Sequence, residues 1–125
     1  MYRATTPTHK FCFGEVDPEG FKEIRITYVQ NGGIVFEKTK DDLAFGIEDA
    51  DEGTHYHASL RLSQEETSRF KPIANSYVSL QIRACDYDGN VVASDILKIP
   101  LLDVLNDEVL EWNLIFLLKV KLYQL

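Results

Sequence analysis

The sequence has only two cysteines, Cys12 and Cys85, and neither belongs to a closely spaced pair. Small secreted domains that depend on disulfides carry more cysteines, and structural zinc sites need neighbouring pairs of cysteines or histidines. The two cysteines therefore fit reduced thiols better than a disulfide framework or a zinc site, and we expect both thiols to stay reduced. The N-terminal part also lacks a basic segment followed by an apolar stretch, so we expect synthesis and folding in the cytoplasm.

Positive charge is scarce as well. Lysine and arginine number 13 against 20 aspartates and glutamates, and the formal net charge is −7. A surface of this sign repels phosphate groups and anionic lipid headgroups, which removes the usual driving force for binding nucleic acid or a membrane surface. We therefore expect neither nucleic acid nor a membrane as a partner. Hydrophobic residues at 45% and charged residues at 26% match one ordinary globular domain.

Motifs of common enzymes are missing, among them the GxSxG elbow, the GxxxxGK loop and the HExxH pair. His55 and His57 project from one face of a predicted strand, and they would share a metal only if His9 or an acid supplied a third ligand. The acidic residues 41–52 and the turn at 86–90 lack the spacing of a calcium loop. We therefore expect no catalytic residue, no metal and no cofactor; a hydrolase that uses His55 or His57 is the alternative.

What the sequence does contain is alternation of apolar and polar residues along most of its length, which is typical of strands with one buried face. The clearest hairpin joins residues 24–29 to 34–39. Its turn, Asn31-Gly32-Gly33, tolerates positive φ angles, and the alternation places Ile34 and Phe36 on the same face of the return strand. The sequence therefore predicts antiparallel pairing from the start of the chain.

Further strands and one helical turn follow the same pattern. Ser63 and Glu66 have the spacing of a capping box, which predicts one helical turn before Pro72. The other predicted strands cover residues 9–13, 43–47, 55–62, 77–85 and 91–99. We expect these aromatic side chains in the core: Phe11, Phe13, Tyr28, Phe36, Phe45 and Tyr56.

The predicted fold is an all-β, immunoglobulin-like Greek-key β-sandwich of about seven antiparallel strands over residues 1–110. A partly closed barrel is the alternative. The only tryptophan, Trp112, follows both cysteines, so the cysteine-tryptophan-cysteine spacing of antibody domains is missing and the likeness is one of architecture.

Residues 111–125 form a C-terminal extension that is more apolar than the rest. It is too short to cross a membrane as a helix, and it contains two lysines. The segment is expected either to cover a sheet edge of its own domain or, as we prefer, to contact a second subunit; a short amphipathic helix over 107–118 is the alternative. The candidate partner interface is the apolar face of the predicted strand: Trp112, Leu114, Phe116, Leu118, Val120 and Leu122.

Five segments of the chain carry a resemblance to a known family, and they cover about residues 1–110 in order. They are Met1–His9, Ile26–Gly32, Leu62–Thr67, Val78–Arg83 and Ala93–Ile96. In these segments the chain resembles small uncharacterised proteins encoded in prophages of Gram-positive bacteria. That family in turn is similar to the immunoglobulin-like N-terminal domain of upper baseplate proteins in tailed phages. The resemblance ends after Leu110.

The resemblance implies a non-catalytic structural or adaptor module of a phage particle, associated with the tail or baseplate. The expected partners are other phage structural proteins and a second copy of the chain, and the expected location is the virion after synthesis in the host bacterial cytoplasm. The resemblance carries no catalytic residues. A module that binds glycans or host proteins is the alternative function.

Overall fold

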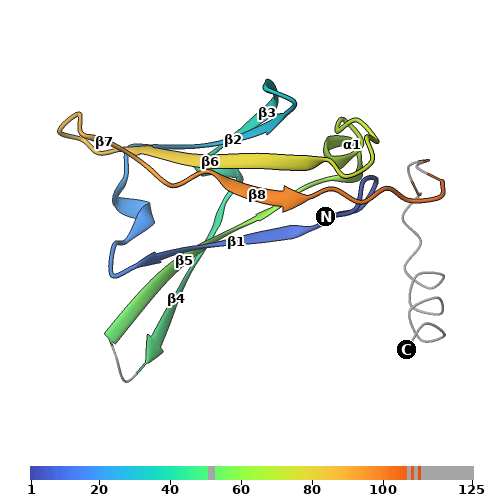
Figure 1. The fold of residues 1–125 in the computed structure, drawn as a ribbon. Helices are drawn as coiled ribbons and strands as arrows, with labels where there is room; N and C mark the ends of the chain where they lie inside the picture. The colour runs from blue at the N-terminus through green and yellow to red at the C-terminus, as the bar shows by residue number, and fades with distance from the viewer. Residues whose placement is uncertain (51–52, 107, 109, 111–125) are drawn as a thin grey trace.

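The computed structural model describes residues 1–50, 53–106, 108 and 110, and it confirms the all-β prediction. Two antiparallel sheets face each other (Figure 1): a three-stranded sheet in the order β1-β5-β4, and a five-stranded sheet in the order β3-β2-β6-β7, with β8 also paired to β6. The strands are β1 (Thr8–Gly14), β2 (Glu23–Gln30), β3 (Gly33–Thr39), β4 (Ala44–Ala50), β5 (Gly53–Arg61), β6 (Tyr77–Cys85), β7 (Val91–Ala93) and β8 (Leu97–Pro100).

The short helices are α1 (Gln64–Thr67) and the 3-10 turns Pro18–Gly20 and Lys40–Asp42. The chain passes from one sheet to the other between β1 and β2, between β3 and β4, and between β5 and β6. The finer assignment to an immunoglobulin-like Greek key stays a prediction. No helix of the described residues is long and apolar enough to cross a membrane.

The core is made by the inward faces of β2, β5 and β6. Ile24, Ile26 and Tyr28 are each 0% exposed, and the Tyr28 ring stacks on Phe36 with ring centroids 4.8 Å apart. Burying each such side chain stabilises the fold by about 1.5–3 kcal/mol relative to exposure. Of the six aromatic residues predicted in the core, Phe13, Phe45 and Tyr56 are only partly buried, because the sheets diverge towards the tip of the β4–β5 hairpin (Figure 1).

The β2–β3 hairpin confirms the predicted turn but corrects the predicted faces. Asn31 and Gly32 have φ angles of 52° and 78°, as in the two-residue turns that match the twist of paired strands. Tyr28 pairs with Phe36 but Val29 pairs with Ile34, so one extra residue interrupts β3. The prediction that Ile34 and Phe36 share a face is therefore wrong. The bulge turns Ile34 outward, where it is 67% exposed, while Phe36 stays at 7%.

The last predicted strand, residues 91–99, is divided into β7 and β8. The amide of Ile82 donates to the hydroxyl of Ser94 at 3.0 Å, and the amide of Ser94 donates to the carbonyl of Ile82 at 2.8 Å. A side-chain oxygen therefore replaces one backbone acceptor of the ladder, and regular pairing stops there until Leu97. Because of this interruption the described residues form eight strands, where about seven were expected.

The capping box at α1 is confirmed. The hydroxyl of Ser63 accepts from the amide of Glu66 at 3.1 Å, and the Glu66 carboxylate accepts from the amide of Ser63 at 3.0 Å. Lys38 on β3 also donates to Glu66 at 2.6 Å. Burial by itself would raise the pKa of the Glu66 carboxyl, but the hydrogen bonds from Lys38 and Ser63 outweigh it and lower that pKa. The helical turn is thus fastened to the five-stranded sheet.

Arg3 joins three chain segments at the α1 end of the sandwich. Its Nε donates to the carbonyl of Phe70 at 2.5 Å, its Nη2 to the carbonyl of Ser68 at 3.1 Å, and its Nη1 to the Asp103 carboxylate at 2.8 Å. Arg3 is 5% exposed, so these donors replace water that the site excludes. The N-terminal segment is thereby fixed beside both α1 and the chain that follows β8.

Candidate functional site

The outer surface of the five-stranded sheet is the most distinctive surface of the described chain. We call it the five-stranded face. Its side chains alternate with the core residues of β2, β3 and β6, and β8 extends it at one edge. Its main members are Arg25, Thr27, Val29, Ile34, Glu37, Ser79, Gln81, Arg83, Ile96 and Lys98.

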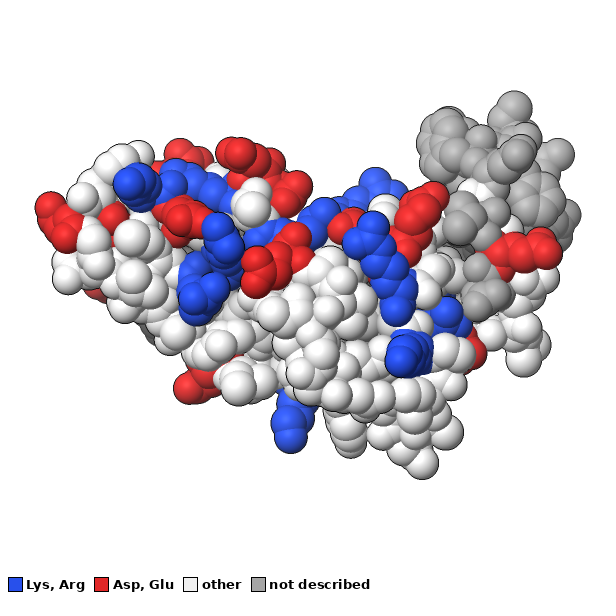
Figure 2. Space-filling model, turned by 90° about the horizontal axis from the view of Figure 1, so that it is seen from above, with Lys and Arg blue, Asp and Glu red and all other residues white. Residues whose placement is uncertain are grey.

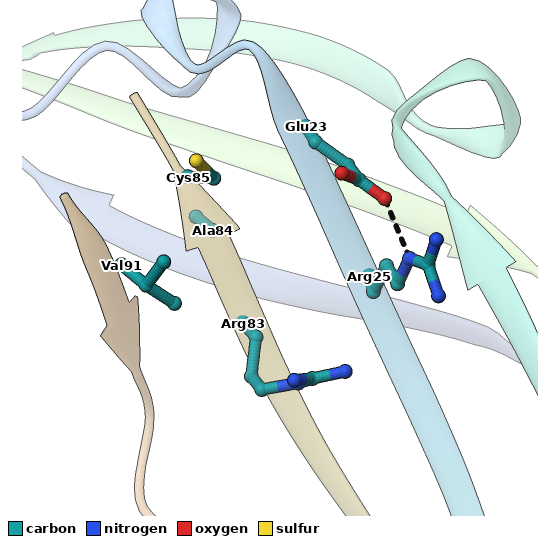
Figure 3. Close-up of a pocket in the computed structure, with 6 residues that line it drawn as sticks. All are labelled: Glu23, Arg25, Arg83, Ala84, Cys85 and Val91. Carbon is teal, nitrogen blue, oxygen red and sulfur yellow. Dashed lines mark hydrogen bonds and ion pairs between the residues drawn. The ribbon is translucent and has the colours of Figure 1, made fainter. Parts of the chain in front are cut away.

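Two neighbouring hollows cover much of this face, and Arg83 lines both. The larger has a volume of about 650 Å³ and includes Val29, Ile34 and Ile96 in its lining. The smaller has a volume of about 280 Å³ and lies between β2, β6 and β7. Figure 3 shows the Arg83 side chain reaching from β6 towards β2 in the smaller hollow. The Arg83 side chain therefore lies at the boundary between the two hollows.

Charges on the five-stranded face are unevenly paired. Arg25 donates to Glu23 at 2.6 Å and lies 3.6 Å from a Glu37 oxygen. The hydrogen bond and the two carboxylates raise the pKa of the Arg25 guanidinium. Arg83 is the register partner of Arg25 on β6, and like charges directly opposite each other are unfavourable. Within the described residues, the side chains of Arg83 and Lys98 form no hydrogen bond or ion pair, so both cations can meet an anionic group.

Exposed apolar side chains lie beside these cations. Ile34 is 67% exposed and Ile96 is 63% exposed, and both line the larger hollow together with Val29. Figure 2 shows this side of the molecule, where side chains of both charge signs form a band next to a broad uncharged area. Apolar side chains bordered by polar and charged groups are typical of surfaces that bind other proteins.

The outer surface of the three-stranded sheet carries an ion pair between two of its strands. Lys10 on β1 donates to Glu48 on β4 at 2.7 Å, and this hydrogen bond lowers the pKa of the Glu48 carboxyl. His57 Nδ1 lies 3.9 Å from the same carboxylate. The His57 ring lies over Gly46, where an added Cβ would be 2.3 Å from Nε2. The glycine therefore lets the ring lie flat across β4.

The three histidines do not converge. His55 and His57 lie on the outer surface of β5, as the alternation predicts, whereas His9 lies on the inward phase of β1. There the ring nitrogen Nδ1 of His9 is 2.7 Å from the hydroxyl of Tyr28. In the part of the chain that the structure describes, no three His, Cys, Asp or Glu side chains are grouped closely enough to hold a metal ion.

The buried position of His9 predicts a pH dependence. Burial lowers the pKa of its imidazole below the ordinary value of 6.5. In the unfolded chain the ring takes up a proton at a higher pH than in the folded chain, so stability is complete above the unfolded pKa and falls as the pH drops through it. When the pH is lowered from about 7.5 to about 5.5, we expect the urea concentration at the unfolding midpoint to decrease in the wild type. The decrease should be smaller in His9→Gln. An equal decrease in both proteins would contradict this assignment, and His55→Gln is the control.

The candidate interface predicted from sequence lies outside the described residues: Trp112, Leu114, Phe116, Leu118, Val120 and Leu122. The same holds for the 111–125 extension as a whole. No motif in the sequence marks Arg83, Ile34, Ile96 or Lys98 as a site residue. The alternation along β6 was enough to place Arg83 outward, but nothing in the local sequence shows that it faces Arg25.

Comparison with known proteins adds no assignment. The sequence matches no protein-family model, and no curated protein is significantly similar to it.

Proposed function

We propose that this chain is a non-catalytic structural or adaptor module of a phage particle, associated with the tail or baseplate, and that it binds another particle protein through the five-stranded face. The observation that carries the binding part is the pair of unpaired cations, Arg83 and Lys98, beside the exposed side chains of Ile34 and Ile96. The phage setting rests on the sequence resemblance over residues 1–110.

The chemistry of the face defines the partner surface. Lys98 lies opposite Ser79, four residues along β6 from Arg83. Partner carboxylates placed opposite Arg83 and opposite Lys98 would gain charge-assisted hydrogen bonds that neither side chain has within the described chain. Apolar side chains beside these carboxylates would cover Ile34 and Ile96 and remove their exposed area from water. The partner patch is therefore a mixed one, with acidic groups and an apolar surround. Because the chain as a whole carries a net charge of −7, the attraction is local, and it selects orientation more than it adds long-range steering.

A protein partner is favoured over a glycan by the positions of the exposed aromatic rings. Tyr77 is 56% exposed and Tyr87 is 76% exposed. Tyr77 begins β6 and Tyr87 follows its end, and β6 has nine residues. A strand of that length separates the two rings by about 30 Å, so they cannot stack together on one short sugar chain. Tyr77 and Tyr87 therefore provide no shared aromatic platform for a glycan.

Reversing the charge of Arg83 tests the proposal. In a phage that carries this gene, we expect Arg83→Glu to reduce incorporation of the protein into particles at least about 10-fold, because a carboxylate would then face the partner's acidic group. Arg61→Glu makes the same charge change on β5 of the other sheet, and its incorporation should match the wild type. Quantitative mass spectrometry of purified particles measures both variants. Equal incorporation of Arg83→Glu and Arg61→Glu would refute the proposed face.

A further inference from the structure

The two sheets of the sandwich differ in width along one side. β1 is the edge strand of the described three-stranded sheet, and β7 and β8 form an edge of the other sheet; residues of β1 and β7 line one common cleft. Val92 pairs with Ala84 and Leu97 pairs with Leu80, so all four side chains lie on the inward phase. Ala84 and Leu80 are 4% and 2% exposed, but Val92 and Leu97 are 55% and 47% exposed. Inward side chains this exposed indicate that the opposite sheet is one strand too narrow to cover them.

A cleft lies where the missing strand would be. It has a volume of about 270 Å³ and opens between β1 and β7, and we call it the edge cleft. Its lining is mostly apolar: Phe11, Cys12, Phe13, Val16, Phe21, Ile82, Ala84, Val92, Ala93 and Ser94. The volume suits one or two large apolar side chains, which would complete the core at this side.

The backbone beside the cleft is available for pairing. Of the described strands, β1 pairs only with β5, so the amides and carbonyls on its other side have no ladder partner among the described residues. An edge of this kind can accept a further strand, whose backbone supplies the hydrogen bonds and whose alternate side chains supply specificity. The occupant of the edge cleft should therefore be an extended segment with apolar residues at every second position.

One segment of this chain has that pattern. Residues 112–122 carry an apolar side chain at every even position, and Lys119 and Lys121 occupy odd positions. The described chain leads to this segment through Leu110, whose amide donates to the Gln64 side chain at 2.8 Å and whose carbonyl accepts from it at 3.2 Å. The 15 residues that follow can span about 50 Å when extended, which is longer than the edge of a small sandwich.

Chain direction favours pairing between copies. Leu110 is held at α1, and α1 lies beside the start of β1, because the Thr5 amide donates to the Thr67 hydroxyl at 3.1 Å. A strand that leaves this point and follows β1 of the same copy runs parallel to it. Every pairing between the described strands is antiparallel, and antiparallel ladders are slightly more stable. A second copy can approach in the antiparallel direction without a long connection.

We infer that residues 112–122 of one copy add as a strand to the free edge of β1 in a second copy and fill its edge cleft, so that the chain forms a homodimer by mutual exchange. The even-numbered side chains cover Val92 and Leu97, and the odd-numbered side chains face solvent. The edge cleft is separate from the five-stranded face, so this inference stands or falls independently of the proposed function.

Two pairs of matched variants test the inference in the full-length chain. Val92→Asp places a carboxylate in the edge cleft, and Val91→Asp places it one residue away on the outer phase, at a position already 64% exposed. Phe116→Asp and Leu117→Asp are the corresponding pair in the donor segment. We expect Val92→Asp and Phe116→Asp each to raise the dimer dissociation constant at least about 100-fold, since an unpaired charge would enter an apolar cleft. Val91→Asp and Leu117→Asp should stay within a few-fold of the wild type.

Sedimentation equilibrium over a range of concentrations gives the dissociation constants, and circular dichroism checks that each variant is folded. Mixing Val92→Asp with Phe116→Asp should restore a dimer, because the first variant keeps a working donor and the second keeps a working cleft. A wild-type chain that stays monomeric would overturn the inference. So would a dimer that Val92→Asp and Val91→Asp weaken equally, because the edge cleft would then not be the contact.

Discussion

Ile26→Ala is expected to lower the free energy of unfolding by about 2–5 kcal/mol, because it removes a fully buried side chain and leaves a cavity that the close-packed core fills only in part. Ile26 is 0% exposed and belongs to the main hydrophobic cluster with Tyr28 and Leu80. Urea unfolding, followed by far-ultraviolet circular dichroism, measures the change in the free energy of unfolding. The result tests whether β2 lies at the centre of the core.

Ile34→Ala in the same hairpin is the matched control. The substitution is chemically identical, but the bulge turns Ile34 outward, so the free energy of unfolding should change by less than about 0.5 kcal/mol. If Ile34→Ala cost as much as Ile26→Ala, Ile34 and Phe36 would share the core face after all. The bulge and the position of Ile34 in the larger hollow would then be refuted together.

Arg3→Leu is expected to destabilise the domain by about 3 kcal/mol. The reason is the loss of donors to the carbonyls of Phe70 and Ser68, which would remain in a site that excludes water. The ion pair with Asp103 contributes less, because the Asp103 side chain is 46% exposed. Chemical unfolding of the purified variant gives the change directly.

Arg61→Leu is the control for this prediction, because Arg61 is exposed and makes only a 3.5 Å contact to the hydroxyl of Thr6. Its free energy of unfolding should stay within about 0.5 kcal/mol of the wild type. A similarly small effect for Arg3→Leu would show that the N-terminal segment is not fixed by the arginine. The described connection between the first residues, α1 and the chain after β8 would then be wrong.

The strands could be predicted from sequence because apolar and polar residues alternate along a strand that has one buried face and one exposed face. The β2 strand, the turn at Asn31 and Gly32, and the capping box of Ser63 and Glu66 are all local patterns of this kind. The bulge in β3 was not predictable, because residues 34–36 are all apolar. The sequence therefore does not show whether Ile34 points into the core or out to solvent. The break at Ser94 depends on a hydrogen bond to Ile82, a residue distant in sequence.

The candidate site was harder to predict, because it depends on contacts between strands. Arg83 faces Arg25, and Glu23 and Glu37 pair with Arg25 and not with Arg83, because of the register of β2 with its two neighbours. The edge cleft depends on a difference in the width of two sheets, which no single strand reveals. The donor pattern of residues 112–122, in contrast, is visible in the sequence itself.

The two surfaces that we propose for binding lie on different parts of the molecule. The five-stranded face is the outer surface of one sheet, and the edge cleft is the gap between both sheets at β1 and β7. A dimer formed through the edge clefts would therefore leave both five-stranded faces free. Such a dimer could present two copies of the same binding surface to a particle.

Cross-linking mass spectrometry of purified particles with an amine-reactive reagent tests most directly whether the five-stranded face binds another particle protein. Lys98 belongs to the five-stranded face, and Lys10 lies on the outer surface of the other sheet. We expect the protein to be present in the particles, and we expect Lys98 to be cross-linked to a different particle protein while Lys10 is not. Particles that lack the protein, or cross-links that join Lys10 to other proteins as often as Lys98, would contradict it.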